Sequence, residues 1–320
     1  MLNIDADTVN ARLDMGSCIS LMKQAQIDQY SQTANCPPRS FMPLLNNGQL
    51  LIMPAASADV VGTKLLTLSP ANSSKDIPVI QGVILLFDVN TGSPIATIDA
   101  ASVTAIRTAA ASAAATDVLA TQHAKSLAII GSGVQAKSHI EAMMCIRELD
   151  RIRIYSRNRA SALLLAAETR EQFTIDCEVA SSSQGAIREA DLICTVTSSR
   201  TSVVKADWIS PGCHLNLVGA HSPDMREVDT ETIKCASIFL EDTKMALIEA
   251  GDIVIPIAEG ALKTSDIKGD IAEVYLNEKA GRTSDSEVTL YKSLGNAIQD
   301  ITAAHALYRS VISAGDSPPA

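Results

Sequence analysis

The segment that most constrains the fold is Ser126–Ile140, with the sequence SLAIIGSGVQAKSHI. Leu127 to Ile130 are apolar and β-compatible, which predicts a strand buried on both faces. Gly131, Gly133 and Ala136 follow in the pattern G-x-G-x-x-G/A, directly before a helix-forming run. The first glycine permits a tight turn, the second lets backbone N–H groups approach a pyrophosphate, and the alanine lets helix and strand pack closely. The segment therefore predicts a dinucleotide-binding Rossmann unit with phosphates at the helix N-terminus.

The composition is typical of a globular enzyme. The chain has 320 residues, of which 47% are hydrophobic and 19% charged, enough for about two domains with a sizeable core. A net charge of -10 argues against nucleic acid or an anionic membrane surface as partner. No apolar run approaches the roughly 18 to 20 residues of a membrane span, and we expect no secretory signal. The seven cysteines stand singly and the five histidines do not cluster, so we expect reduced thiols, no metal and a cytoplasmic location.

The predicted elements change their rhythm near residue 120. Before it, a helical stretch at 5–31 precedes two hairpins, at 39–55 and 79–99, and an Ala-rich helix at 101–120. This part predicts a mostly antiparallel sheet with leading helices. After residue 120, short strands alternate with helices. The strands are expected at 126–130, 152–155, 174–178, 191–195, 213–218 and 236–240.

That alternation is typical of βαβ units and predicts a parallel sheet covered on both faces. A last helix is expected at 296–312, with a frayed tail from Gly315. The fold class is therefore α/β. It combines a Rossmann NAD(P)-binding domain with an α+β domain that has a mostly antiparallel sheet.

One cation, Arg107, stands inside the Ala-rich predicted helix and is followed by Thr108. A buried cation is costly unless an anion meets it. Two interpretations stay open from the residues alone. Arg107 either forms a buried ion pair with a protein carboxylate or clamps a ligand's carboxylate or phosphate.

The second Rossmann strand ends in Ser156, Arg157 and Asn158. NAD-specific sites place an acidic residue there to accept hydrogen bonds from the ribose hydroxyls, and this sequence has none. A hydroxyl, a guanidinium and an amide suit phosphate oxygens instead. The sequence therefore favours NADPH, with NADH as a usable alternative, although a merely solvated Arg157 would look the same.

Two later strand ends complete the expected cofactor site, because ligands of open α/β sheets bind at the carboxyl ends of strands. We expect ribose and nicotinamide at Thr195–Thr197 and the reacting ring beside Gly219–His221. The candidate cofactor-binding residues are Thr108, Gly131, Ser132, Gly133, Val134, Gln135, Ala136, Ser156, Arg157, Asn158, Thr195, Val196, Thr197, Val218, Gly219, Ala220 and Ser293.

Four segments together resemble the ornithine cyclodeaminase/μ-crystallin family: RTAAASAAAT, GSGVQA, VGAHSPDMREVD and SDSEVTLYKSLGNAIQD. The resemblance covers nearly the whole chain. It implies a substrate-binding and dimerisation domain, 1–120 completed by 297–320, and a Rossmann NADP-binding domain, 121–296. It also implies a homodimer with substrate held between the domains.

In the family, an Arg and a Lys from the first sheet join the Arg of the RTAA helix around the substrate carboxylate. Arg39, Lys64 and Arg107 match these positions. Three cations can fix a carboxylate while the adjacent carbon faces the nicotinamide. Without the resemblance, Lys64 would be read as an edge or snorkelling lysine.

Two departures bear on the activity that the resemblance implies. Ornithine cyclodeaminases carry a Glu just before the L/I-M-P of the first hairpin, where this chain has Leu51. They also carry an Asp at the later strand end, where this chain has His221. A cyclodeaminase must bind a second, cationic amine and shuttle its protons, which are tasks for carboxylates. Cyclodeamination is therefore disfavoured.

The simpler chemistry that fits is NADPH-dependent reduction of a small cyclic imino acid. Candidates are Δ1-pyrroline-2-carboxylate, giving L-proline, and Δ1-piperideine-2-carboxylate, giving L-pipecolate. Leu51 and Met53 would line the methylene side of the ring. His221 either donates a proton to the imine or only shapes the pocket, and Asp224 is a second candidate acid. Ring size stays open, because one methylene in an apolar pocket is worth only about 1 to 3 kcal/mol.

Two other functions stay in view. One is an alanine-dehydrogenase-like or N-substituted amino-acid dehydrogenase on the same fold. The other is a non-catalytic, crystallin-type protein that binds NADPH, which the three clamp cations disfavour because a pure cofactor binder has no use for them.

Overall fold

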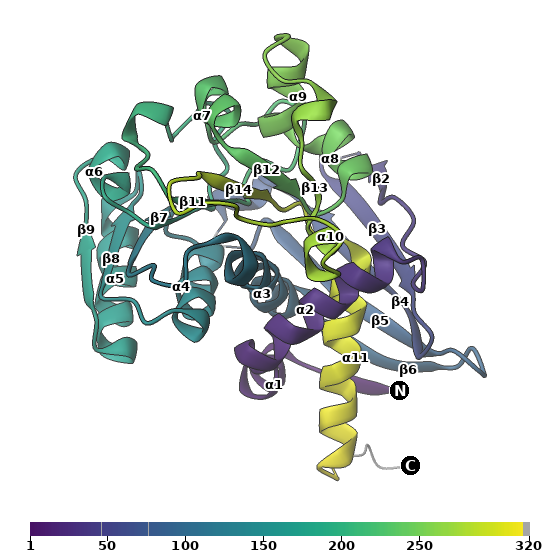
Figure 1. Cartoon of the computed structure of the whole chain (residues 1–320). Coiled ribbons are helices and arrows are strands. Elements are labelled where there is room, and N and C mark those ends of the chain that lie inside the picture. The colour runs from purple at the N-terminus through teal and green to yellow at the C-terminus, as the bar shows by residue number, and fades with distance from the viewer. Residues whose placement is uncertain (46, 76, 316–320) are drawn as a thin grey trace. The chain divides into compact units, whose positions relative to one another are not determined.

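A computed structural model describes residues 1–45, 47–75 and 77–315 (Figure 1). It contains two compact units, Met1–Ala110 with Gly295–Ala320, and Ala111–Leu294. The sequence predicts divisions after residues 120 and 296. In the structure the first boundary lies between Ala110 and Ala111 instead, inside a continuous helix, Ala100–Leu119, where a change in the sequence pattern gives no signal. The predicted fraying of the tail concerns residues 316–320, outside the described part.

The first unit is built on a six-stranded sheet in the order β1-β6-β5-β4-β3-β2. All neighbouring strands pair antiparallel except β1 with β6, so the sheet is mixed. The elements are β1 (Leu2–Ile4), α1 (Ala6–Arg12), α2 (Met15–Tyr30), β2 (Ser40–Pro43), β3 (Gln49–Ala56), β4 (Val60–Leu68), η1 (Pro70–Ser74), β5 (Ile80–Asp88), β6 (Pro94–Asp99), α3 (Ala100–Leu119) and α11 (Ala297–Ser313).

The predicted helical stretch at 5–31 is divided into two helices, α1 and α2. Asp5 caps the first by accepting a hydrogen bond from the backbone N–H of Thr8, and Asp14 caps the second in the same way with Ser17. The first helix ends at its C-cap Leu13, and Asp14 starts the second because its carboxylate satisfies a backbone donor at the helix N-terminus.

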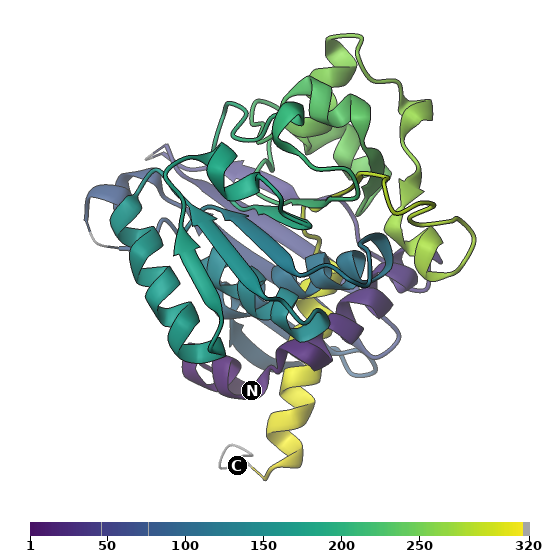
Figure 2. The same ribbon diagram turned by 60° about the vertical axis from the view of Figure 1, so that its left-hand side comes forward.

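The two faces of the first sheet differ in burial. Met53, Lys64, Ile84 and Ile98 lie opposite one another on β3, β4, β5 and β6, and all four are buried. The last helix, α11, packs against β3, β4 and β5 and lies beside α2 (Figure 1). Figure 2 shows the same yellow helix beside the purple helices from a second direction. A side chain on this face therefore meets the first turns of α11.

The second unit is an eight-stranded parallel sheet in the order β13-β12-β14-β11-β10-β7-β8-β9. Its strands are β7 (Ser126–Ile130), β8 (Arg151–Tyr155), β9 (Asp176–Val179), β10 (Leu192–Thr195), β11 (His214–Leu217), β12 (Ser237–Leu240), β13 (Gly269–Asp270) and β14 (Thr289–Lys292). The connecting elements are α4 (Val134–Ile146), α5 (Arg159–Phe173), α6 (Ser183–Ile187), η2 (Ala206–Trp208), α7 (Thr230–Cys235), α8 (Thr243–Glu249), α9 (Gly251–Ala258), η3 (Thr264–Asp266) and α10 (Ile271–Tyr275).

The predicted α/β class and the six predicted parallel strands are confirmed. The order of the strands in the sheet differs from their order along the chain, because β14 lies between β11 and β12. The strand order reverses between β7 and β10, whose carboxyl ends form the point where ligands bind in such sheets.

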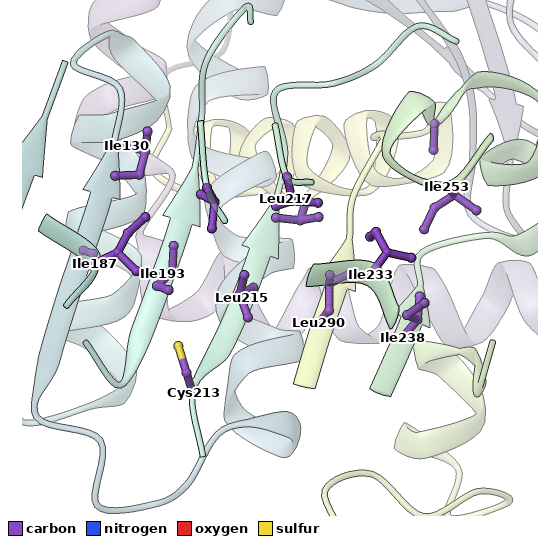
Figure 3. Close-up of a cluster of buried hydrophobic side chains, with 14 of the residues drawn as sticks. Ile130, Ile187, Ile193, Cys213, Leu215, Leu217, Ile233, Ile238, Ile253 and Leu290 are labelled. Atoms are coloured by element: carbon purple, nitrogen blue, oxygen red, sulfur yellow. The ribbon is translucent and has the colours of Figure 1, made fainter. Parts of the chain in front are cut away.

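The core of the second unit is formed by apolar side chains from its central strands and from the helices that cover them. Ile130, Ile193, Leu215, Leu217 and Leu290 are buried in one cluster on neighbouring strands (Figure 3). Each such side chain contributes about 1.5–3 kcal/mol when fully buried. Within the described residues, no helix has both the length and the apolarity that crossing a bilayer requires.

Candidate active site

The glycine turn after β7 has the geometry that the motif predicts. Gly131 has φ +130°, and a Cβ there would lie 2.8 Å from the carbonyl oxygen of Val196, so only glycine fits. Gly133 is the N-cap of α4 and has φ −89°, and a Cβ there would meet no atom within 4 Å. Ala136 is fully buried. The chain conformation thus requires a glycine at position 131, whereas Gly133 leaves open space at the N-terminus of α4, where a phosphate could bind.

The end of β8 lies next to this turn. Ser132 Oγ donates a hydrogen bond of 2.9 Å to Ser156 Oγ. Asn158 Oδ1 accepts from the backbone N–H of Ser161 at 3.1 Å and so caps α5. Arg157 is exposed. Of the three predicted phosphate-binding side chains, Asn158 thus has a structural task, and Arg157 is the one that carries a charge.

Arg159, the first residue of α5, is also exposed and is not among the predicted cofactor residues. The pattern Arg-Asn-Arg at the end of a second Rossmann strand is a signal that could have identified it. Two guanidinium groups therefore flank the N-terminus of α5, where anions are favoured.

A buried carboxylate, Glu227, joins the carboxyl ends of β10 and β11. Its oxygens accept hydrogen bonds from Thr195 Oγ1 at 2.8 Å, from the backbone N–H and the hydroxyl of Thr197 at 2.7 Å each, and from the backbone N–H of Gly219 at 2.7 Å. Burial and the neighbouring Asp252 raise the pKa of Glu227, while Lys292 opposes the shift. Glu227 thus fixes both loops that the sequence analysis assigned to the cofactor.

The fully buried hydroxyl of Thr195 is committed to Glu227, which does not favour the predicted contact of Thr195 with ribose. Ser293 is also buried, and its hydroxyl donates to Glu241 at 3.3 Å. Ala220 and Thr108 are buried, whereas Val134 is 69% exposed at the first position of α4. Gln135, Val196 and Val218 are partly buried in the same turns.

The two candidate acids lie in the loop after β11. His221 and Asp224 are both exposed. Asp224 accepts a hydrogen bond from Ser222 Oγ at 2.6 Å and forms an ion pair with Arg200. That pair joins the loop after β10 to the loop after β11, so Asp224 has a partner on each side.

The first unit contains a buried cluster of charges around Asp300. Lys64 Nζ lies 2.6 Å from Asp300 Oδ2, and Arg107 Nε donates to Asp300 Oδ1 at 2.8 Å. The side chains of Lys64, Arg107 and Asp300 are 2%, 5% and 0% exposed, respectively. Arg107 Nη1 also donates to Gln299 Oε1 at 2.9 Å. The buried ion pair that the sequence analysis left open for Arg107 is therefore present.

Arg39 belongs to the same cluster. Its Nη2 donates to the backbone carbonyl of Gly295 at 2.7 Å, and a Cβ on Gly295 would collide with the guanidinium of Arg107. Lys64 and Arg107 both contact one carboxylate, Asp300, so these two buried cations carry one positive charge more than Asp300 balances, and the partly buried Arg39 lies beside them. An excess of this kind in a buried place favours an anion.

Burial lowers the pKa of Lys64 to about 8, and Asp300 opposes this shift while Arg107 and Arg39 add to it. Met53 lies directly opposite Lys64 on β3, and Leu51 lies two residues earlier on the same face, partly buried. The structure therefore places Arg39, Lys64 and Arg107 near one another, with Met53 paired to Lys64 and Leu51 on the same face of β3. Asp300, Gln299 and Gly295 were not predicted.

The sequence model of the ornithine cyclodeaminase/mu-crystallin family matches residues 4–315. The chain belongs to this family. A Delta(1)-pyrroline-2-carboxylate reductase of Bacillus cereus (strain ATCC 10987 / NRS 248) is 35% identical over 319 residues, covering 98% of each protein.

Two solved structures are also similar to this chain. Thermococcus litoralis Delta(1)-pyrroline-2-carboxylate reductase, in complex with NADH and L-proline, has a TM-score of 0.95 and 33% identity over 98% of both chains. An archaeal alanine dehydrogenase dimer with bound NAD has a TM-score of 0.93 and 30% identity over 98% of this chain and 97% of the other. Both likenesses cover the family fold from end to end.

Proposed function

We propose that this family member reduces a cyclic ketimine acid with a nicotinamide cofactor, converting Δ1-pyrroline-2-carboxylate to L-proline and the six-membered homologue to L-pipecolate. The observation that carries the proposal is the buried pair of cations Lys64 and Arg107, which carries one positive charge more than Asp300 balances and lies beside Arg39. The Bacillus cereus relative and the Thermococcus litoralis complex with NADH and L-proline support it.

The chemistry needs little beyond binding and orientation. The cations hold the substrate carboxylate, a hydride from the reduced nicotinamide adds to C2 of the C=N bond, and the ring nitrogen carries the proton. Such an imine is readily protonated in water, so a dedicated acid is optional. If His221→Ala still reduces the ketimine at an unchanged rate, His221 is not the proton donor.

The absence of the cyclodeaminase carboxylates supports reduction over cyclodeamination. Leu51 stands at one of these positions and His221 at the other. We propose that the first unit binds the substrate and that the second binds the cofactor. We further propose a preference for NADPH over NADH, supported by the exposed Arg157 and by the absence of an acidic residue at the end of β8.

Arg157→Ala should raise the Kd for NADPH by about tenfold or more and leave the Kd for NADH within about twofold, because one charge-assisted contact to the 2′-phosphate is lost. The measurement is titration of cofactor fluorescence with both nucleotides. Arg188→Ala, at an exposed arginine distant in sequence from the glycine turn, is the matched control. An equal loss for both cofactors would contradict the assignment of Arg157.

The function itself is tested by following NADPH absorbance with each of the two cyclic ketimines and with a blank that lacks substrate. We expect consumption with Δ1-pyrroline-2-carboxylate and Δ1-piperideine-2-carboxylate, and none without substrate. Ornithine with NAD+ should yield no proline. No turnover of either cyclic ketimine would refute the proposal.

The likeness to the archaeal alanine dehydrogenase supports a second candidate function, reductive amination of an open-chain 2-oxo acid. The same three cations would hold that carboxylate. Pyruvate with ammonia or methylamine distinguishes the two functions, since rates rivalling those of the cyclic imines would favour the dehydrogenase.

We also propose a homodimer. Ile52, Leu65 and Val83 lie opposite one another on the face of the first sheet that α11 does not cover, and Val83 is 44% exposed. An apolar sheet face of this kind is typical of an interface. Sedimentation should give twice the mass of the 33.8 kDa chain.

A further inference from the structure

The carboxylate of Asp300 is the centre of the cation cluster, although the reduction of an imine assigns it no chemical task. It lies in the first turns of α11 and is fully buried. Its two oxygens contact cations from two other elements, Lys64 on β4 and Arg107 on α3. One side chain thus links three elements that are far apart in sequence.

Asp300 is a poor direct ligand for the proposed substrate, because two carboxylates repel each other. Its contacts instead determine which donors are left for an anion. On Arg107, Nε is directed to Asp300 and one Nη1 hydrogen to Gln299, so these contacts leave Nη2 unused. On Lys64, one N–H is directed to Asp300, and Thr104 Oγ1 lies 3.4 Å away. Both cations are therefore held in fixed orientations before any ligand binds.

We propose that Asp300 is a positioning residue, which orients Lys64 and Arg107 so that their remaining donors converge on the substrate carboxylate. This inference rests on the proposed function. Preorganised donors bind an anion more tightly than donors that must first be ordered. Losing Asp300 should therefore weaken substrate binding without touching the cofactor.

Asp300 also influences the pH range over which Lys64 is charged. The charged groups that face Lys64 are Asp300 on α11, Arg107 on α3 and Arg39 before β2, and its neighbours Met53 and Ile84 are apolar. The thiol of Cys18 on α2 lies near Arg107, and burial raises the pKa of that thiol to about 12, so it stays neutral.

Burial holds the pKa of Lys64 at about 8, and Asp300 is the group that opposes a further decrease. Removing its charge lowers the pKa of Lys64 again. Lys64 then loses its proton, and its attraction for a carboxylate, at a lower pH.

The test compares wild type with Asp300→Asn and Asp300→Glu. We expect Asp300→Asn to raise KM for the ketimine at least about tenfold, with the Kd for NADPH unchanged. In wild type we expect kcat/KM to decline near pH 8, where Lys64 loses its proton, and in Asp300→Asn this decline should move down by about one pH unit or more. Asp300→Glu keeps the charge and should raise KM while the decline stays near its wild-type position.

Unchanged KM and an unchanged pH profile in Asp300→Asn would overturn the inference. If Asp300→Asn does not fold, Asp300→Glu decides it, since a wild-type KM in that variant would also overturn it. Calorimetric titration with L-proline separates this inference from the proposed function. If wild type binds L-proline more tightly than Asp300→Asn does but reduces no ketimine, the positioning role stands and the proposed function fails.

Discussion

Gly295→Ala is expected to lower kcat/KM for the cyclic ketimine by about 100-fold or more while leaving the Kd for NADPH unchanged. Gly295 has φ +72°, and a Cβ there would collide with Nη1, Nη2 and Cζ of Arg107. The guanidinium cannot yield without breaking its contacts with Asp300 and Gln299, because its side chain is 5% exposed and held by both. The substitution removes no polar group, so a loss of activity would report the displacement of Arg107 itself.

Gly260→Ala is the matched control for this prediction. Gly260 has the same φ of +72°, but a Cβ there would meet no atom within 4 Å. Both variants bear the left-handed backbone cost of about 1–2 kcal/mol, and only Gly295→Ala adds the collision. Thermal unfolding, kcat/KM and NADPH titration of both variants separate the two effects. A parallel loss of activity in both would show that backbone strain, and not Arg107, is responsible.

Much of the second unit could be predicted because its strands and helices differ in period and its glycine turn has one physical solution. Leu127 to Ile130 are apolar in sequence and buried in the structure. The position of β14 between β11 and β12 could not be predicted, since strand order depends on packing across the whole sheet. The three-residue strand β1 is too short to show a period.

The residues of the candidate site also fall into those that could be predicted from the sequence and those that could not. Arg107 could be noticed because a cation inside an Ala-rich helix is conspicuous, whereas Arg39 and Lys64 came from the family resemblance. Asp300 and Glu227 were missed because an acidic residue in a helix or a loop usually faces water. Their burial is visible only when α11 lies on the first sheet and when the ends of β10 and β11 meet. Buried carboxylates that position other side chains of a site do not form a recognisable motif in the sequence.

Gly133→Ala should raise the Kd for both NADPH and NADH by about 10-fold to 100-fold without lowering stability. The backbone at Gly133, φ −89°, suits alanine, and the new methyl group would meet no protein atom within 4 Å. Alanine is a poorer N-cap than glycine, but a gain of about 0.4–1 kcal/mol from fewer unfolded conformations offsets this difference, so no net loss of stability is expected. The remaining cost is the loss of the space that a pyrophosphate needs at the N-terminus of α4.

Gly131→Ala, two residues earlier, should lower the stability of the fold, in contrast to Gly133→Ala, which should weaken cofactor binding. Its φ of +130° is open to glycine alone, and the Cβ would lie 2.8 Å from the carbonyl oxygen of Val196, so the cost falls on folding, by about 3 kcal/mol or more. Urea unfolding and cofactor titration of both variants distinguish a glycine required by the chain from one required by the ligand. Wild-type affinity of Gly133→Ala for both nucleotides would mean that no pyrophosphate approaches this turn, and the cofactor site would have to be placed elsewhere.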